Sequence, residues 1–204
     1  MENRIDDDKL KHIRAVAEVM YDNAEALKDF NIDKEVAFTV GMLHDIGYIR
    51  GKDNHSRNGA DIVNRVGFDN RFSEDNVNAI KFHGTDGYRM IQEGNIKHIS
   101  PMLILLQYAD MTVDKYGNKV GFDKRLEDIK DRYGENSATY NNCCKEVNFL
   151  KEVCFFEMDT DRADYPLLCP LKEREFYDRI GDVFNRLTLR PEIPSEKETE
   201  YDRE

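Results

Sequence analysis

A histidine and an aspartate stand side by side at the end of an apolar run, where both side chains could do chemistry. The run begins at Gly41, the pair is His44-Asp45, and Gly47 breaks the pattern that follows. Neither side chain favours burial, and a buried charge is costly unless it is paired or bound to a metal ion. The pair therefore predicts a partner group or a metal ion in the core.

Three further polar residues fall on the apolar faces of separate helical segments. They are His12, His83 and Asp110, and each shares its face with aliphatic residues three or four positions away. Any one of them alone is more typical of a hydrogen-bonded core residue than of a metal ligand. Together they favour a metal centre, because one centre would satisfy all of them.

The elements that must position these side chains are helices, since the apolar periodicity is helical nearly everywhere. Segment 159–170 has no useful strand alternation and is expected to be an irregular connection. The sequence predicts an all-α fold, a single bundle of about seven to nine helices. The expected helices cover residues 10–27, 33–44, 55–66, 74–83, 101–111, 122–133, 137–156 and 171–188.

Composition restricts the class of protein. Hydrophobic residues make up 40% of the 204 residues, and the formal net charge is −11. An acidic chain is a poor match for coating a nucleic-acid duplex, which needs a basic surface. The acidic start and the short apolar runs predict no signal peptide and no membrane partner. Four cysteines without a C-x-x-C pair predict reduced thiols and a cytoplasmic location.

The order of the polar residues resembles the HD-domain superfamily of metal-dependent phosphohydrolases. That pattern is a His, a His-Asp pair and a distant Asp. It appears as His12 in "KHIRAVAEVM", His44-Asp45 in "HDIGY" and Asp110 in "QYADMTVD". The resemblance implies that these four residues bind metal and that residues 1–190 form one HD-type domain. Its metal-site core would cover about residues 8–115, with a helical extension at 116–190 and a charged tail at 191–204.

Three more segments resemble parts of HD proteins. "NHSRNGADIV" is similar to the H-x-x-x-G-A segment of two-metal members, and "AIKFHGTDGY" is similar to their later I-x-x-H segment. By this resemblance His55 and His83 complete a second metal position, and Asp45 bridges two ions. "GFDKRLEDIKDRYGENS" is similar to a segment after the last Asp of some bacterial members.

The resemblance implies one or two divalent transition-metal ions as cofactors. Imidazole and carboxylate ligands suit Fe, Mn, Co, Ni or Zn better than Mg. The expected activity is hydrolysis of a small phosphate ester or anhydride, nucleotide-like, by metal-activated hydroxide, with Asp45 and His44 as catalytic residues. The chain has no G-x-S-x-G elbow and no Walker loop. Two alternatives stay open: a mixed-valence di-iron oxygenase on the same ligands, and a non-catalytic binding or regulatory module.

Substrate contacts are harder to predict from sequence. The candidates to hold phosphate are Arg57, Lys81 and Lys115, and after them Lys52 and Arg125, although each type is more typical of a solvated surface charge. Tyr48, Phe82 and Tyr88 are candidates to line a pocket for a base. His98 lies outside the pattern and is expected at the surface. The expected partner is a small phosphorylated molecule, and a homodimer is left open.

Overall fold

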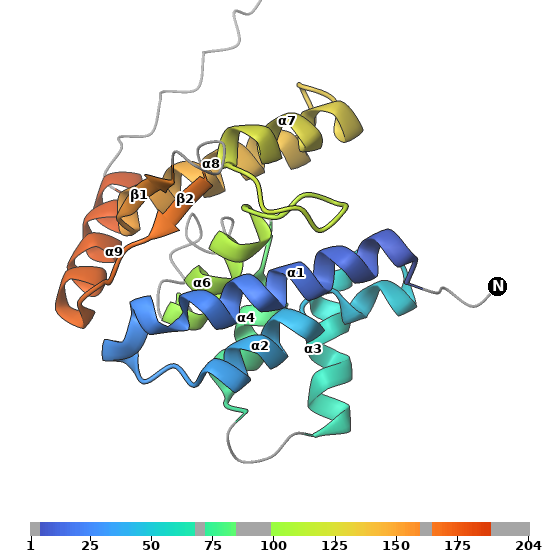
Figure 1. The fold of residues 1–204 in the computed structure, drawn as a ribbon, viewed down its shortest axis with the longest axis horizontal. Coiled ribbons are helices and arrows are strands. Elements are labelled where there is room, and N and C mark those ends of the chain that lie inside the picture. The colour runs from blue at the N-terminus through green and yellow to red at the C-terminus, as the bar shows by residue number, and fades with distance from the viewer. Residues whose placement is uncertain (1–4, 68–71, 85–98, 160–164, 189–204) are drawn as a thin grey trace, which may run out of the picture.

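The computed structural model describes residues 5–67, 72–84, 99–159 and 165–188 (Figure 1). Within these ranges there are eight α-helices, two 3-10 helices and one two-stranded sheet, so the predicted all-α fold is confirmed. The α-helices are α1 (Asp7–Asn23), α2 (Lys34–Leu43), α3 (His55–Val66), α4 (Glu74–Phe82), α6 (Pro101–Asp110), α7 (Phe122–Tyr133), α8 (Ala138–Val153) and α9 (Glu173–Thr188). The 3-10 helices are η1 (Ala24–Phe30) and η2 (Ile46–Arg50), and the strands are β1 (Phe156–Asp159) and β2 (Tyr165–Leu168).

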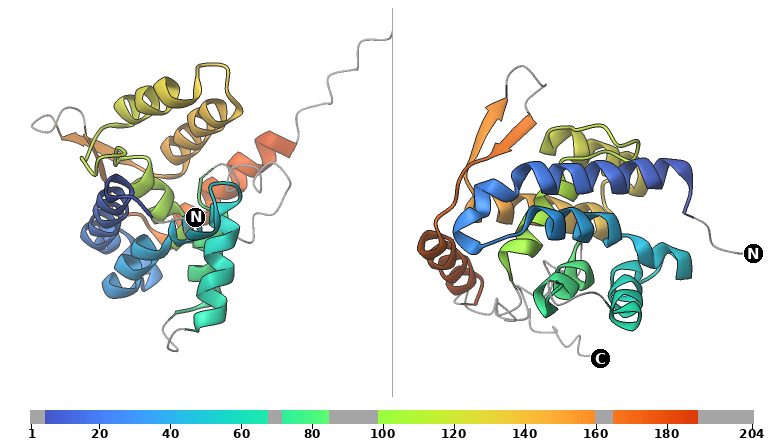
Figure 2. Two further views of the ribbon diagram at one scale, coloured as in Figure 1. Left: turned by 90° about the vertical axis from the view of Figure 1, so that its right-hand side faces the viewer. Right: turned by 60° about the horizontal axis from the view of Figure 1, so that its bottom comes forward.

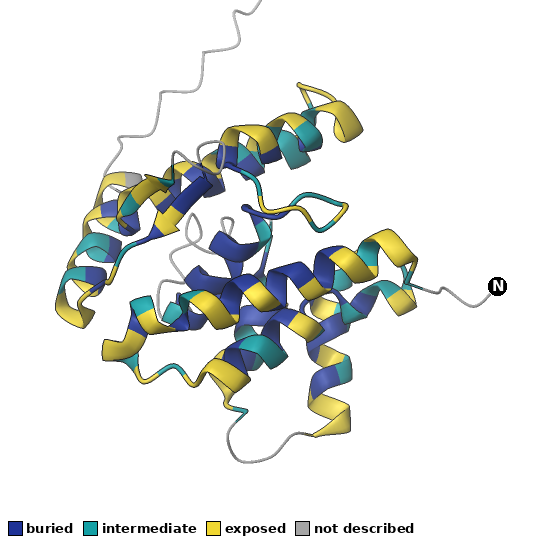
Figure 3. Ribbon diagram, in the orientation of Figure 1, coloured by how far each residue is buried: buried dark blue, intermediate teal, exposed yellow. Residues whose placement is uncertain are grey.

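Helix α6 is the centre of the bundle. It contacts α1, α4 and α8, while α1 packs along α2 and α3 packs against both η2 and α4 (Figures 1 and 2). Every residue from 102 to 109 is buried, which explains the uninterrupted apolar run in this helix (Figure 3). Ser100 caps its start by accepting a hydrogen bond from the backbone N–H of Leu103 at 3.2 Å.

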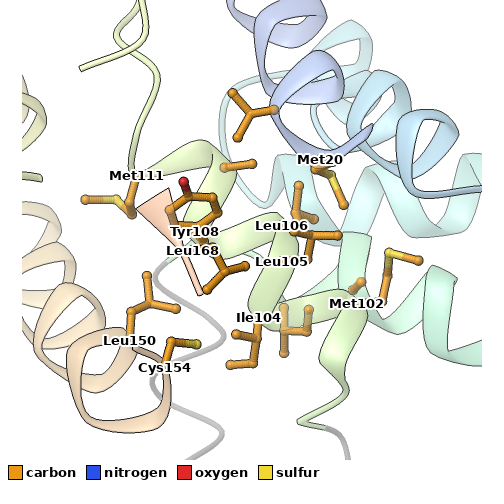
Figure 4. Close-up of a cluster of buried hydrophobic side chains, with 14 of the residues drawn as sticks. Met20, Met102, Ile104, Leu105, Leu106, Tyr108, Met111, Leu150, Cys154 and Leu168 are labelled. Carbon is orange, nitrogen blue, oxygen red and sulfur yellow. The ribbon is translucent and has the colours of Figure 1, made fainter. Parts of the chain in front are cut away.

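Side chains from both halves of the chain meet around α6. Figure 4 shows Leu105 and Leu106 of α6 near Met20 of α1, and Leu150 of α8 beyond the other side of the helix. These residues belong to one continuous apolar core. The N-terminal helices and the C-terminal extension are therefore held together through α6, whose last residue is Asp110.

The expectation of an irregular connection at 159–170 is wrong for residues 165–168. These residues form β2 and pair antiparallel with β1, in the register Phe156 opposite Leu168 and Asp159 opposite Tyr165. Each strand has four residues, too few for an alternating pattern to stand out. The hairpin is anchored from α6, because the Tyr108 hydroxyl donates a hydrogen bond to the Pro166 carbonyl at 2.6 Å.

Two helix ends also differ from the expectation. The first α-helix stops at Asn23, whose side-chain amide donates to the Val19 carbonyl at 2.8 Å, and the chain continues as the 3-10 helix η1. Helix α8 stops at Val153, because Cys154 is already extended. A hydrogen bond from a side chain to the backbone ends α1, and the turn into the hairpin ends α8. Apolar periodicity does not predict either of these features.

The cysteines and the lengths of the apolar helices bear on the class of protein. The four cysteines, Cys143, Cys144, Cys154 and Cys169, are free thiols. Among the residues described, none of the helices combines the length and the apolar character needed to cross a bilayer.

Candidate metal centre

The structure brings the six predicted ligands together from six elements. His12 lies in α1 and His55 begins α3, while Asp110 is the last residue of α6. His44 follows α2 directly and His83 follows α4 directly, with Asp45 leading into η2. All except His55 and Asp110, which are partly exposed, are buried. Helix ends thus deliver most of these groups to one point, as in many bundles that bind metal.

Asp45 stands at the middle of the cluster. Its Oδ1 lies 3.3 Å from Nε2 of His55 and 3.4 Å from Nε2 of His83. Its Oδ2 lies 3.2 Å from Nε2 of His44 and 2.8 Å from Nζ of Lys9. The two carboxylate oxygens therefore face different sets of groups, the arrangement that a carboxylate bridging two ions requires.

His12 and Asp110 form the other side of the cluster. Nε2 of His12 lies 3.0 Å from Oδ1 of Asp110, and the His12 and His44 rings are 5.7 Å apart between centroids. In the described residues two groups have ligand atoms within 4.8 Å of one another: His12, His44 and Asp110; and His44, Asp45 and His83. His44 belongs to both, so two metal positions would lie next to each other.

Each of the four imidazoles is oriented by a backbone carbonyl at its other nitrogen. Nδ1 of His44 lies 2.6 Å from the Gly41 carbonyl, and Nδ1 of His83 lies 2.6 Å from the Ile80 carbonyl. His55 and His12 make the same contact with the carbonyls of Lys52 at 3.3 Å and Asp114 at 2.9 Å. A carbonyl only accepts, so Nδ1 carries the proton and donates it, which aims Nε2 at the centre. Metal-binding histidines in proteins are held in this way.

Buried nitrogen atoms provide the test of whether a metal fits. Nε2 of His44 and Nε2 of His83 are both buried, and neither has a hydrogen bond of acceptable geometry with a described residue. Each lies close to a carboxylate oxygen of Asp45, and two hydrogen-bond acceptors whose lone pairs face each other repel unless a cation stands between them. The residues therefore fit a divalent ion with nitrogen and oxygen ligands.

The ionisation of the cluster follows from burial and mutual charge. Burial alone would raise the pKa of Asp45 and of Asp110, but His44 and His12 respectively hold each pKa well below its usual value. Burial lowers the pKa of His12, and it lowers that of His55 to about 4. Burial opposes the charged form of His44, but its contacts with Asp45, the Asp110 charge and the Gly41 carbonyl together raise its pKa. Without metal, a proton on His44 and the Lys9 ammonium supply the positive charge that the carboxylates need.

Two glycines let the supporting elements approach closely. A Cβ on Gly47 would lie 1.8 Å from the carbonyl oxygen of His55, so no larger residue fits where η2 packs on α3. A Cβ on Gly41 would lie 2.5 Å from Cα of Ala17, where α2 crosses α1. The glycine that ends the "HDIG" segment is thus required for Asp45 and His55 to meet.

The predicted phosphate-binding residues lie farther out. Arg57 is exposed in the first turn of α3, Lys81 is exposed on α4 with its Nζ 5.0 Å from the centroid of the Phe82 ring, and Lys115 is half-buried with its Nζ 4.9 Å from that of Tyr116. Tyr88 and His98 fall outside the described residues. A role for Arg57, Lys81 and Lys115 in holding phosphate stays a prediction.

Two cationic side chains contact the cluster, and neither contact was predicted from the sequence. Lys9 was not considered, although it stands three residues before His12 and so shares its helix face. Arg125 was expected to be a solvated surface charge, and this is wrong: it is 6% exposed and its Nη2 lies 3.3 Å from Oδ1 of Asp110. Arg125 stands three residues after Phe122 and four before Ile129, which are both buried on the same face of α7. This helical spacing indicates that Arg125 is buried as well.

Of three comparisons with known proteins, one found a match. No curated protein and no solved structure matches the chain. A family model described as "HD domain" matches residues 10–113, which run from the turn of α1 that carries His12 to just past Asp110. This range is half of the chain and includes all six residues of the cluster. The chain therefore belongs to the HD-domain family, whose members bind divalent metals and are for the most part metal-dependent phosphohydrolases.

Proposed function

We propose that this protein is a metal-dependent phosphohydrolase that cleaves a phosphate ester or anhydride of a small nucleotide-like substrate. The observation that carries the proposal is the convergence of four Nε2 atoms on two carboxylates, with two of those atoms buried and lacking hydrogen bonds among the described residues. A divalent metal accounts for this arrangement, and family membership favours hydrolysis as its use.

The residues divide into two sets of ligands with Asp45 between them. His12, His44 and Asp110 would hold one ion, His55 and His83 the other, and Asp45 would contribute one oxygen to each. Paired divalent ions supply an activated water and neutralise charge on the attacking and leaving oxygens of phosphoryl transfer. The carbonyl contacts at each Nδ1 keep the imidazoles in the tautomer that can bind metal.

The substrate side of the cluster has a cation and an aromatic ring. Nζ of Lys9 lies 2.8 Å from Asp45 and 4.4 Å from the centroid of the Tyr48 ring. Tyr48 in turn lies 4.4 Å from the ring of His55, tilted by 35°. With a divalent ion balancing the charge of Asp45, the Lys9 ammonium would be available to bind a phosphate oxygen. Tyr48 would then provide a flat face for a base.

Other parts of the proposal rest on the sequence. Arg57, Lys81 and Lys115 remain candidates for a more distant phosphate, Arg57 most of all because it stands two residues after His55. The free thiols support a cytoplasmic enzyme. A homodimer is left open.

The test begins with metal analysis of protein purified without chelator. A screen for phosphate release follows, across nucleotides and dinucleotides with Mn²⁺, Co²⁺, Fe²⁺, Ni²⁺ or Zn²⁺. D45A should abolish turnover and keep the helical circular-dichroism signal, because it removes the carboxylate shared by both ions. D61A, which changes an exposed aspartate on α3, is the matched control and should remain active.

Two outcomes would reject the proposal. Full activity of D45A would show that the reaction does not depend on this carboxylate. A chain that binds iron and consumes oxygen while releasing no phosphate would support the di-iron oxygenase instead.

A further inference from the structure

Helix α7 lies beyond the matched range of residues 10–113, yet it contributes a side chain to the metal cluster. That side chain is Arg125, in the first turn of the helix. Only 8% of it is exposed. Arginine is rarely buried without a partner, because removing its charge from water is costly. The position of Arg125 therefore needs a reason, and its contacts provide one.

Arg125 stands between two carboxylates. Its Nη2 donates to Oδ1 of Asp110 at 3.3 Å, and its Nη1 donates to Oδ2 of Asp128 at 3.0 Å. Asp128 also accepts a hydrogen bond from Nη2 of Arg132 at 2.9 Å. A guanidinium is planar and has donors on separate arms, so one arginine can bind both carboxylates with a fixed distance between them.

The contact with Asp110 acts on a proposed metal ligand. Asp110 is the last residue of α6, and its Oδ1 also lies 3.0 Å from Nε2 of His12. Three helices, α1, α6 and α7, thus meet at one carboxylate oxygen. Groups that hydrogen-bond to metal-binding carboxylates fix their orientation, and loss of such a group commonly lowers metal affinity about 10–100-fold.

Charge balance explains why a cation can stand so close to a cation site. An isolated arginine next to Asp110 would repel a divalent ion. Asp128 binds the other arm of Arg125, so that the pair adds less net positive charge near the metal than Arg125 alone would. The arrangement provides orientation while limiting the electrostatic penalty.

We propose that Arg125 is a positioning residue for the metal centre: it holds the Asp110 carboxylate toward the ion shared with His12 and His44, with Asp128 compensating its charge. The inference rests on the metal centre of the proposed function. It also assigns a role to the segment "GFDKRLEDIKDRYGENS", which contains both Arg125 and Asp128.

The experiment is a Co²⁺ titration of chelator-stripped full-length protein, followed by visible absorption and by competition with a chelator of known affinity. R125M should weaken the ion held by His12 and Asp110 about 10–100-fold and change its absorption band, because the carboxylate loses its orientation. The ion held by His55 and His83 should keep its affinity. R132Q is the matched control: it removes another arginine that pairs with Asp128 but not with Asp110, and it should bind Co²⁺ like the unmodified chain.

Two more variants separate positioning from charge and from folding. R125K keeps the charge but cannot reach both carboxylates, so it should restore little of the lost affinity. R125M/D128N removes both members of the pair and leaves no unpaired charge at Asp128, so it should fold normally and still bind the ion weakly. Full affinity in R125K, or in R125M/D128N, would overturn the positioning role.

The outcomes distinguish this inference from the proposed function. Unchanged Co²⁺ affinity and absorption in R125M would overturn the inference alone. Equal weakening in R132Q would overturn it too, because the effect would then come from α7 in general. Weakened binding in R125M, in a chain that releases phosphate from no substrate, would support the inference and reject the hydrolase. A chain that binds no Co²⁺ would reject both.

Discussion

The six residues of the cluster differ in how far solvent can reach them. His12, His44, Asp45 and His83 are almost fully buried, whereas His55 and Asp110 are partly exposed. A substrate entering the site would therefore approach past His55 and Asp110. Lys9 and Tyr48 lie beside that approach, which agrees with a role in binding rather than in folding alone.

The proposal of two ions divides the four histidines of the cluster into two classes. H55A and H83A should each lower bound metal from about two ions per chain to about one, because each removes a ligand of the same ion. H12A should lower occupancy of the other ion, and D45A should lose both. Mass-spectrometric metal analysis measures the stoichiometry. One ion per chain, unchanged in H83A, would leave a single-metal site.

A buried acid behind the site predicts a pH-dependent stability. Burial raises the pKa of Glu146, on α8, to about 8 from an ordinary value of 4.5, and the Asp110 charge adds to the effect. The folded chain therefore keeps a proton that the unfolded chain releases between these pH values. The stability that protonated Glu146 contributes is therefore fully present below about pH 4.5 and is lost as the pH rises toward 8.

E146Q should remove most of this dependence, because glutamine keeps the shape and cannot ionise. Relative to the unmodified metal-free chain, the free energy of unfolding of the variant should rise by about 3–4 kcal/mol more at pH 8 than at pH 5. Urea unfolding at both pH values measures the difference. The same gain at both values would mean that ionisation of Glu146 does not cause it.

At the scale of elements, close helix contacts place the ligands. Helix α3 carries His55 and packs on η2, and the contact depends on Gly47 having no side chain. G47A should destabilise the chain by about 3 kcal/mol and weaken the ion at His55, because η2 and α3 must separate. In G181A on α9, the added methyl group meets no atom within 4 Å, and it should stabilise the helix by about 0.5–1 kcal/mol. Thermal unfolding of both variants measures the contrast, and equal stability would contradict it.

Sequence periodicity predicted the long amphipathic elements well and the short or polar ones poorly. The positions of His12 and Asp110 followed from their aliphatic neighbours on the same helix faces. The strands β1 and β2 were not foreseen, because four residues are too few for alternation to be visible and pairing across a hairpin decides them. Arg125 was misplaced since its partner Asp110 is fifteen residues away, and residue type alone favours the surface for arginine.

For the whole molecule, the HD match covers the cluster, but the folded core does not stop there. Residues 10–113 match the family, and α8, β2 and α9 add buried side chains to the same core. The division into a core at 8–115 and an extension at 116–190 stays a prediction about sequence, since Arg125 and the apolar contacts of α6 join the two parts.

Metal binding should stabilise the molecule as a unit. An ion that binds only the folded chain adds about 2.7 kcal/mol at one hundred times its dissociation constant, a rise of about 5–10 °C in Tm for a chain of this size. Differential scanning fluorimetry with Mn²⁺ or Co²⁺ against chelator measures it. D45A should lose the shift, and an equal shift in D45A would place the ion elsewhere.

The carbonyl contacts at the imidazoles have a consequence for the order of events during folding. Three of them join a histidine to a residue three positions earlier: His44 to Gly41, His55 to Lys52 and His83 to Ile80. Loops this short close on the nanosecond timescale, whereas His12 must wait for a carbonyl 102 residues away. We therefore expect a refolding chain to orient the rings of His44, His55 and His83 before that of His12. Metal added during refolding would meet the His55 and His83 position first, and loading of the two ions would be sequential.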